Sequence, residues 1–154
     1  MTLPKATHME FTIERVYPKD PPSRVFHVFC DPEARARWFF GMEGWTMHDV
    51  RSPDVVTPGV TESSRFSPPG TTTVITNDTT YFEMMQDAWL VFAYVMTIDG
   101  RALSSSLSTV RFEKAGKGTR LTFTEQGVYH DGFADGREEG TRAMLERVGA
   151  FLDF

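Results

Sequence analysis

The chain has 154 residues, of which 40% are hydrophobic and 24% charged, and its formal net charge is −5. This length suits one domain over residues 1–154 with a single core, and the composition excludes a disordered or collagen-like chain. The longest apolar run, residues 88–96, is too short to span a membrane, and the acidic balance argues against a nucleic-acid partner. The first residues lack a signal-peptide pattern and a single cysteine cannot form an internal disulfide, so we expect a cytoplasmic protein.

The beginning of the chain predicts one strand followed by two short helices. Apolar and polar side chains alternate over residues 9–14, the period-two pattern of a half-buried strand. Asp20 followed by proline predicts a helix start, and the apolar face of this helix would be formed by Val25, Phe26, Phe29 and Cys30. Asp31 followed by proline repeats the signal, so a second short helix is expected over residues 33–39.

Between residues 44 and 127 the pattern is that of successive strands rich in Thr, Val and aromatic side chains. Short turn signals separate them, which favours antiparallel hairpins. The six expected strands cover residues 45–50, 60–66, 73–84, 88–98, 103–113 and 119–126. Beyond residue 132, an apolar stripe at helical spacing predicts a long final helix, carried by Met144, Leu145, Val148, Phe151 and Leu152. This order predicts an α+β fold in which an antiparallel sheet curls around the final helix.

Side-chain parity within the later strands predicts which groups face that helix. In the strand over residues 88–98, the face with the larger apolar groups carries Leu90, Phe92, Tyr94 and Met96. In the next strand, Val110 and Phe112 share a face with Ser104, Ser106 and Ser108, and in the last strand Leu121 and Phe123 share a face with Glu125. If these faces point inward, the inner wall is aromatic at one end and carries small hydroxyls and one carboxylate at the other. Inward serines would leave volume for a cavity. The alternative is a β-bulge that shifts the register and turns the serines toward water.

The opposite face of the strand over residues 88–98 is also apolar, because it carries Trp89, Val91 and Val95. An outer sheet face in water normally alternates to polar side chains. A second subunit would cover this face, so a homodimer is one hypothesis. The alternative is that these are isolated exposed apolar side chains, which are common.

The usual catalytic and metal-binding signatures are absent from the sequence. The four histidines have no metal-ligand spacing and no cofactor fingerprint is complete, so we expect neither a metal nor a cofactor. Cys30 lies on an apolar helix face, which favours a core position over a nucleophile. Glu125, Tyr94 and His130 remain as candidate acid–base groups, because a carboxylate in an apolar cavity can exchange protons near neutral pH. The alternative for Glu125 is a backbone cap or an ion pair with an arginine near the start of the final helix.

Two stretches carry a more specific pattern. The first comprises residues 15–17, 21–26, 31–32 and 38–39, and the second residues 88–94, 99–101, 106–112, 118–122, 124–127 and 137–141. In this order they resemble the SRPBCC (START-like) superfamily, and within it bacterial members of the branch named after the activator of heat-shock protein 90 ATPase. Phe26 and Phe29 stand where many relatives carry tryptophan, a change that keeps the apolar packing. Thr141 also stands where relatives carry tryptophan, so the cavity near the start of the final helix is expected to be larger or wetter.

This resemblance implies a helix-grip fold, in which a seven-stranded antiparallel sheet wraps the C-terminal helix and two short helices follow the first strand. It also implies a hydrophobic cavity between sheet and helix, but no shared catalytic motif. The leading hypothesis is therefore a protein that binds a hydrophobic small molecule. The alternatives are an enzyme similar to polyketide cyclases and aromatases, and an interaction module of the co-chaperone type. The candidate cavity wall comprises Trp38, Phe39, Trp45, Phe66, Phe92, Tyr94, Met96, Ser106, Ser108, Phe123, Glu125, Met144, Val148 and Phe151.

Overall fold

The computed structural model describes residues 1–40 and 42–153. Its elements, in chain order, are β1 (Ala6–Tyr17), α1 (Pro22–Cys30), α2 (Pro32–Trp38), β2 (Thr46–Arg51), β3 (Thr61–Ser67), β4 (Ile75–Met85), β5 (Trp89–Ile98), β6 (Arg101–Ala115), β7 (Gly118–His130) and α3 (Arg137–Leu152). This is the α+β order that the hydrophobic periodicities predict. The strands extend one to four residues beyond several of the expected ends, because sheet pairing continues past the residues whose pattern alternates clearly.

The two short helices begin differently. Asp31 forms the expected cap of α2, since its carboxylate accepts a hydrogen bond from the backbone N–H of Ala34 at 3.0 Å. The expected cap of α1 at Asp20 is wrong: the N-cap residue is Pro21, without a side-chain hydrogen bond, and Pro22 occupies the first turn. Two consecutive prolines shift the helix start by one residue, because the extended conformation favoured before a proline suits an N-cap position.

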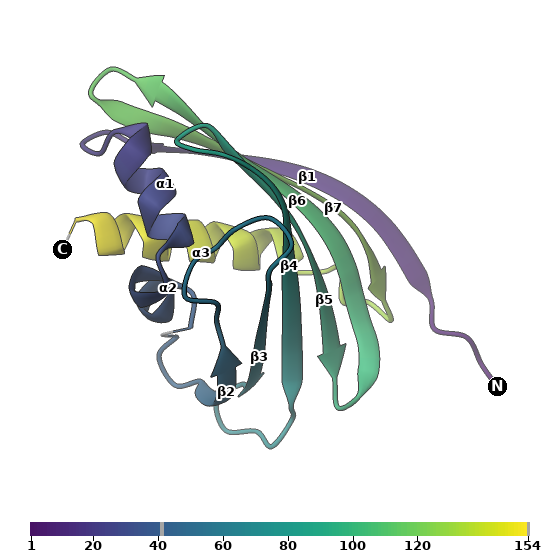
Figure 1. The fold of residues 1–154 in the computed structure, drawn as a ribbon. Coiled ribbons are helices and arrows are strands. Elements are labelled where there is room, and N and C mark those ends of the chain that lie inside the picture. The colour runs from purple at the N-terminus through teal and green to yellow at the C-terminus, as the bar shows by residue number, and fades with distance from the viewer. Residues whose placement is uncertain (41, 154) are drawn as a thin grey trace.

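The seven strands form one antiparallel sheet with the order β1-β7-β6-β5-β4-β3-β2. The chain passes from one edge of the sheet to the other through α1 and α2, and each later strand pairs with its predecessor until β7 meets β1. The sheet curves strongly, and all three helices lie on its concave side, with α3 running across it (Figure 1). The predicted sheet wrapped around a long C-terminal helix is confirmed.

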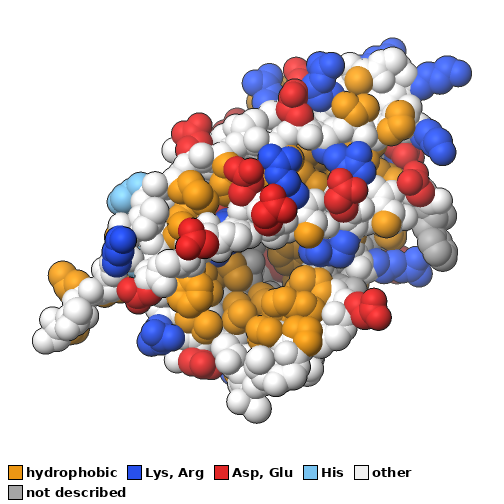
Figure 2. All heavy atoms as spheres, turned by 180° about the vertical axis from the view of Figure 1, so that it is seen from behind, with side chains coloured by type: hydrophobic (Ala, Val, Ile, Leu, Met, Phe, Trp, Pro, Cys, Tyr) orange, Lys and Arg blue, Asp and Glu red, His pale blue; other side chains and the backbone are white. Residues whose placement is uncertain are grey.

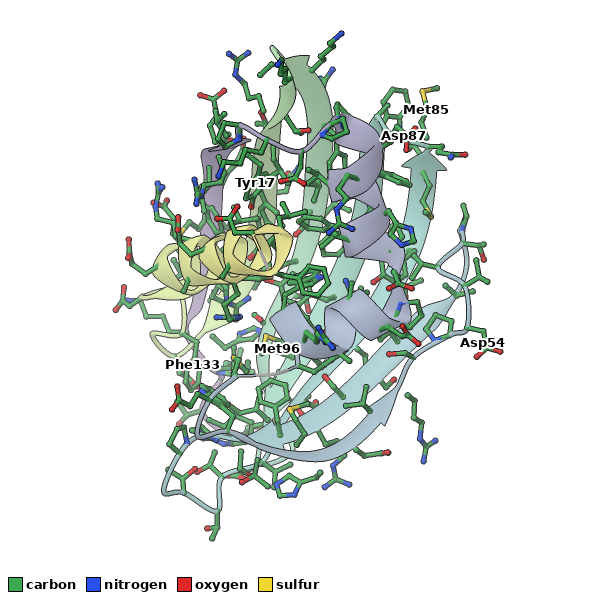
Figure 3. All side chains as sticks on the ribbon, turned by 90° about the vertical axis from the view of Figure 1, so that its left-hand side faces the viewer. Tyr17, Asp54, Met85, Asp87, Met96 and Phe133 are labelled. Atoms are coloured by element: carbon green, nitrogen blue, oxygen red, sulfur yellow. The ribbon has the colours of Figure 1, made fainter. Side chains whose placement is uncertain are left out.

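The core lies between the concave face of the sheet and the helices. Val148 and Leu145 of α3 and Val25 of α1 are buried against strand residues such as Leu121 and Phe112. Tyr17 at the end of β1 lies next to α3 (Figure 3), and its hydroxyl donates a hydrogen bond to the backbone oxygen of Leu145 at 2.8 Å. Apolar packing together with this hydrogen bond therefore anchors the middle of α3 to the sheet.

The inner face of the sheet follows the predicted parity. Ser104, Ser106 and Ser108 are all buried on the concave side, and the register of β6 against β7 is continuous. A bulge does occur between Met96 and Thr97 of β5, but it leaves the serines inward. The alternative of a register shift that exposes them is thus wrong.

The outer face of the sheet is apolar over its centre. Val95 is 47% exposed, and Leu107 on β6 and Phe82 on β4 are exposed as well, while Trp89 and Val91 are half-buried. In the described part of the chain, no helix combines the length and the apolar character that a membrane crossing requires.

Candidate functional site

A pocket of about 220 Å³ lies between α3, the concave face of the sheet and the segment that follows α2. The alternation of β5 places Leu90, Phe92, Tyr94 and Met96 on one wall. Helical spacing along α3 supplies the opposite wall through Arg137, Gly140, Thr141, Met144 and Arg147. Figure 2 shows a hollow lined by hydrophobic side chains, next to a band of acidic and basic groups.

Most residues of the candidate cavity wall lie on this pocket. Those that line it are Trp38, Phe39, Phe66, Phe92, Tyr94, Met96, Phe123, Glu125 and Met144. Five others lie elsewhere: Trp45 packs against Phe66, Val148 is in the core, and Phe151 borders a shallow depression beside α2. Ser108 lies against Glu125, and Ser106 is buried opposite Gly127 of β7. Thr141, which stands where the resemblance implies a tryptophan in relatives, is also part of the lining, as is Gly140.

Glu125 is fully buried, and it is held by a network of polar groups. Tyr94 donates a hydrogen bond to its Oε1 at 2.6 Å and Tyr129 donates one to its Oε2 at 2.7 Å. Arg137, in the first turn of α3, lies 3.7 Å from the same carboxylate and donates hydrogen bonds to the Tyr94 hydroxyl and to Ser104. The expectation that Glu125 pairs with an arginine near the start of the final helix is confirmed.

This network also fills the space above the inward serines. Ser108 donates a hydrogen bond to Glu125 at 3.2 Å, and the Arg137 guanidinium reaches Ser104 at 2.9 Å. Small side chains on β6 thus make room for a buried carboxylate and its arginine rather than for an open void. A buried charge of this kind is tolerated only when it is paired and hydrogen-bonded, as it is here.

The tyrosines of the network are poor proton donors near neutral pH. Burial and the neighbouring Glu125 carboxylate raise the pKa of Tyr94 far above its ordinary value. Burial and the hydrogen bond to Glu125 raise the pKa of Tyr129 to about 12. Both hydroxyls therefore stay protonated and act as hydrogen-bond donors.

A second buried ion pair lies at the α2 end of the pocket. Arg35 donates from Nε to the Oε2 of Glu62 at 3.1 Å and from Nη2 to Oε1, and its Nη1 donates to the carbonyl oxygen of Phe29 at 3.2 Å. Its guanidinium is stacked among aromatic rings, the nearest being Phe39 at 4.9 Å from the ring centroid. Burial alone would lower the pKa of Arg35, but the nearby Tyr81 and Glu62 raise it, so the Arg35 guanidinium stays protonated.

Two further polar groups on the pocket wall are less well satisfied. Arg147 is half-buried, and its Nε donates to the carbonyl oxygen of Trp38 at 2.9 Å. Tyr81 is 1% exposed, and its hydroxyl finds no hydrogen-bond partner among residues 1–40 and 42–153. Burial raises the pKa of Tyr81, so this hydroxyl keeps its proton.

Cys30 lies outside this pocket, in an open groove between α1 and the turn that joins β4 to β5. Met85 and Asp87 mark that turn beside α1 in Figure 3. Burial raises the pKa of the Cys30 thiol to about 12, which makes a thiolate nucleophile unavailable at neutral pH. His130 lies at the end of β7, and its buried Nδ1 has no partner in the described part of the chain.

Sequence reasoning anticipated an arginine partner for Glu125 near the start of the final helix, but it named none of the three arginines of the site. Arg35, Arg137 and Arg147 lie on helices whose exposed positions are also rich in charge, so nothing in their local pattern separates them from solvated residues. For Arg137 a signal was available, because an inward carboxylate at Glu125 requires a buried cation. For Arg35 and Glu62 no local signal exists, since the pair joins α2 to β3.

Comparison with known protein families and solved structures identifies the family of this chain. Residues 19–153 match the family described as Activator of Hsp90 ATPase homolog 1-like protein. No protein of curated function matches the chain. The Mll3558 protein from Rhizobium loti is 40% identical, with a TM-score of 0.84, over 96% of this chain and 99% of that chain.

A protein from Rhizobium leguminosarum is 34% identical, with a TM-score of 0.89, and 99% of each chain is covered. DynU16, from the dynemicin biosynthetic locus, shares the fold alone: it is 16% identical with a TM-score of 0.64, over 94% of this chain and 47% of that one. The family match covers most of the chain and agrees with the seven-stranded sheet around α3. This protein therefore belongs to the Activator of Hsp90 ATPase homolog 1-like family, within the SRPBCC superfamily.

Proposed function

We propose that this protein binds a small hydrophobic or amphipathic molecule in the pocket between α3 and the sheet. The observation that carries the proposal is the pocket itself, which is lined by aromatic and Met side chains from β5, α2 and α3. A folded core normally leaves few voids larger than a water molecule, because unfilled apolar space is costly. An apolar pocket with a few polar groups on its wall is the usual form of a ligand site.

The size of the pocket limits the ligand. An apolar cavity of about 150 Å³ holds benzene, and pockets for drug-sized ligands begin at about 300 Å³. The volume here, about 220 Å³, lies between these values. A molecule of one or two rings, or a short branched chain, would fit without movement of the protein.

Native mass spectrometry of the freshly purified protein, followed by a thermal-shift screen of naphthalene, indole and cinnamamide, tests the proposal. A ligand at a hundredfold excess over its Kd stabilises the folded state by about 2.7 kcal/mol, which for a chain of this length raises Tm by roughly 5–10 °C. We expect a co-purified mass or a saturable shift of this order. A protein that carries no ligand and that none of these compounds stabilises would contradict binding at this site.

A pair of variants on α3 locates the binding. The Cβ of Gly140→Leu would enter open space at the pocket wall, so the larger side chain should occupy part of the pocket and reduce the shift. Ala143→Leu places the same side chain on the exposed side of the same helix and should leave the shift unchanged. Equal shifts in both variants would place the binding elsewhere.

Acid–base catalysis in the same pocket is the second candidate function. Tyr94 and Glu125 line the pocket and share a short hydrogen bond, and Glu125 itself is fully buried, so a bound molecule would meet the protonated Tyr94 hydroxyl with the carboxylate behind it. Once a ligand is known, its turnover in Tyr94→Phe and Glu125→Gln decides the question. Loss of turnover with retained binding would support an enzyme, and unchanged turnover in both variants would exclude these groups.

A further inference from the structure

The charged side chains on the pocket wall are not balanced. Three arginines, Arg35, Arg137 and Arg147, line the pocket, against the single carboxylate of Glu125. Glu62 neutralises Arg35 and Glu125 lies beside Arg137, so both of these cations have a buried partner. Arg147 forms no ion pair with any residue that the structure describes. The pocket and its supporting groups therefore carry one surplus positive charge.

Arg147 is placed at the rim of the pocket. It lines the pocket and also borders the shallow depression formed with Arg37, Trp38 and Phe151. Its Nε is held by the carbonyl oxygen of Trp38, while its terminal nitrogens donate to no residue within 1–40 and 42–153. Burial lowers the pKa of Arg147, which reflects the loss of water around the guanidinium without a compensating anion. Two donors in a planar fork thus remain to bind a carboxylate.

A second unsatisfied group belongs to Tyr81, which lines the same pocket. The ring of Tyr81 packs beside Phe92 with the centroids 5.9 Å apart, and its hydroxyl is buried without a partner in the described chain. Buried hydroxyls almost always form hydrogen bonds, because an unpaired hydroxyl has lost its hydrogen bonds to water without replacing them. A polar atom of the occupant would satisfy it.

On these observations, which rest on the proposed ligand-binding function, we propose that the occupant is an aromatic or similarly apolar carboxylic acid. Its carboxylate pairs with Arg147 at the rim, its apolar body lies against Phe92 and Met144, and an oxygen at its far end hydrogen-bonds to Tyr81. A monoanion matches the single surplus cation. A cationic ligand would meet three arginines, and a phosphate dianion would place excess negative charge in the same pocket as Glu125.

Three probes of nearly equal size separate the parts of this proposal. Cinnamic acid carries the carboxylate, cinnamamide replaces it by a neutral amide, and para-coumaric acid adds a hydroxyl at the far end of the ring. Isothermal titration calorimetry at neutral pH measures the affinity of each. We expect cinnamic acid to bind about tenfold more tightly than cinnamamide, and para-coumaric acid to gain about a further fivefold.

The variants assign these gains to named side chains. Arg147→Met should remove the preference for the acid and leave the affinity for cinnamamide within about twofold, and Arg147→Lys should retain part of the preference. Arg142→Met is the matched control, because Arg142 is an exposed residue of α3 outside the pocket. Tyr81→Phe should abolish only the extra gain of para-coumaric acid. Circular dichroism establishes that each variant is folded.

The outcomes distinguish the two proposals. Equal affinity of the wild-type protein for cinnamic acid and cinnamamide, or an acid preference that survives in Arg147→Met, overturns the assignment of an acid while binding at the pocket stands. A fivefold gain that persists in Tyr81→Phe overturns the role of Tyr81. Failure of all three probes and of the neutral screen overturns the binding function itself, and the inference with it.

Discussion

The buried pair of Arg35 and Glu62 allows the energetics of the pocket wall to be measured directly. Arg35 is 5% exposed and Glu62 is 3% exposed, so neither charge is screened by solvent. Glu62→Gln keeps the shape and part of the hydrogen bonding but leaves the Arg35 cation buried without a counter-ion. Removal of one partner of a buried pair costs about 3–5 kcal/mol. The aromatic rings around Arg35 compensate in part through cation–π attraction, so we expect the lower end, about 3 kcal/mol.

Urea unfolding followed by circular dichroism measures this loss, because the midpoint shifts in proportion to the change in stability if the slope stays constant. The double variant Arg35→Met with Glu62→Leu removes both charges and should lie within about 1–2 kcal/mol of the wild type, since apolar replacements of a buried pair are often neutral. The carbonyl of Phe29, which loses its donor in that variant, and the hydroxyl of Ser52, which loses its acceptor, account for the remaining cost.

The exposed pair of Arg51 and Asp49 provides the control. Arg51→Met breaks an ion pair on the surface and should cost less than about 0.5 kcal/mol. The reasoning is refuted if Glu62→Gln costs less than about 1 kcal/mol, or if the double variant loses as much stability as the single variants Arg35→Met and Glu62→Leu together.

Three further expectations concern other parts of the molecule. Burial raises the pKa of all four tyrosines, Tyr17, Tyr81, Tyr94 and Tyr129. The unfolded state therefore loses phenolic protons from about pH 10, while the folded state keeps them. The contribution of these groups to folding stability is fully present below that pH and decreases toward about pH 12, the pKa of Tyr129, which ionises first in the folded state. Tyrosinate absorbance should therefore rise together with unfolding, and a gradual rise in the folded protein would contradict this. Gly127→Ala places a Cβ 2.7 Å from the Ser106 hydroxyl and should cost about 1–3 kcal/mol, whereas Gly140→Ala, which meets open space within α3, should stabilise by about 0.5–1 kcal/mol; thermal unfolding compares them. We also propose that the exposed apolar centre of the outer sheet face forms a homodimer, so sedimentation equilibrium should give twice the chain mass in the wild type and a monomer in Val95→Asp; a wild-type monomer at high concentration would exclude the dimer.

Much of the fold could be predicted from the sequence, because the signals involved are local. The alternation in β5 identified Phe92, Tyr94 and Met96 as one face of a strand, and the change to helical spacing after residue 132 identified α3. Both periods follow from backbone geometry, which acts between near neighbours. The α2 cap at Asp31 is equally local, since it joins residues three positions apart.

The start of α1 and the lengths of the strands depended on more than the local sequence pattern. Tandem prolines moved the start of α1 past Asp20, and pairing with β7 extended β1 from Ala6 to Tyr17, well beyond its alternating segment. A strand ends where its partner ends, so its length is a property of the sheet.

The candidate site divides along the same line. That Glu125 faces inward follows from its parity with Leu121 and Phe123, and parity belongs to the strand alone. That it meets Tyr94 and Arg137 depends on β5, β7 and the first turn of α3 being brought together by the curl of the sheet, whereas Tyr129 is a partner from the same strand, four residues away. The unpaired state of Arg147 and of the Tyr81 hydroxyl is likewise visible only when every neighbour is in place. The sequence by itself therefore determined which side chains share a face, because backbone periodicity sets that, while the tertiary structure decided which charges are satisfied, because their partners lie on distant elements.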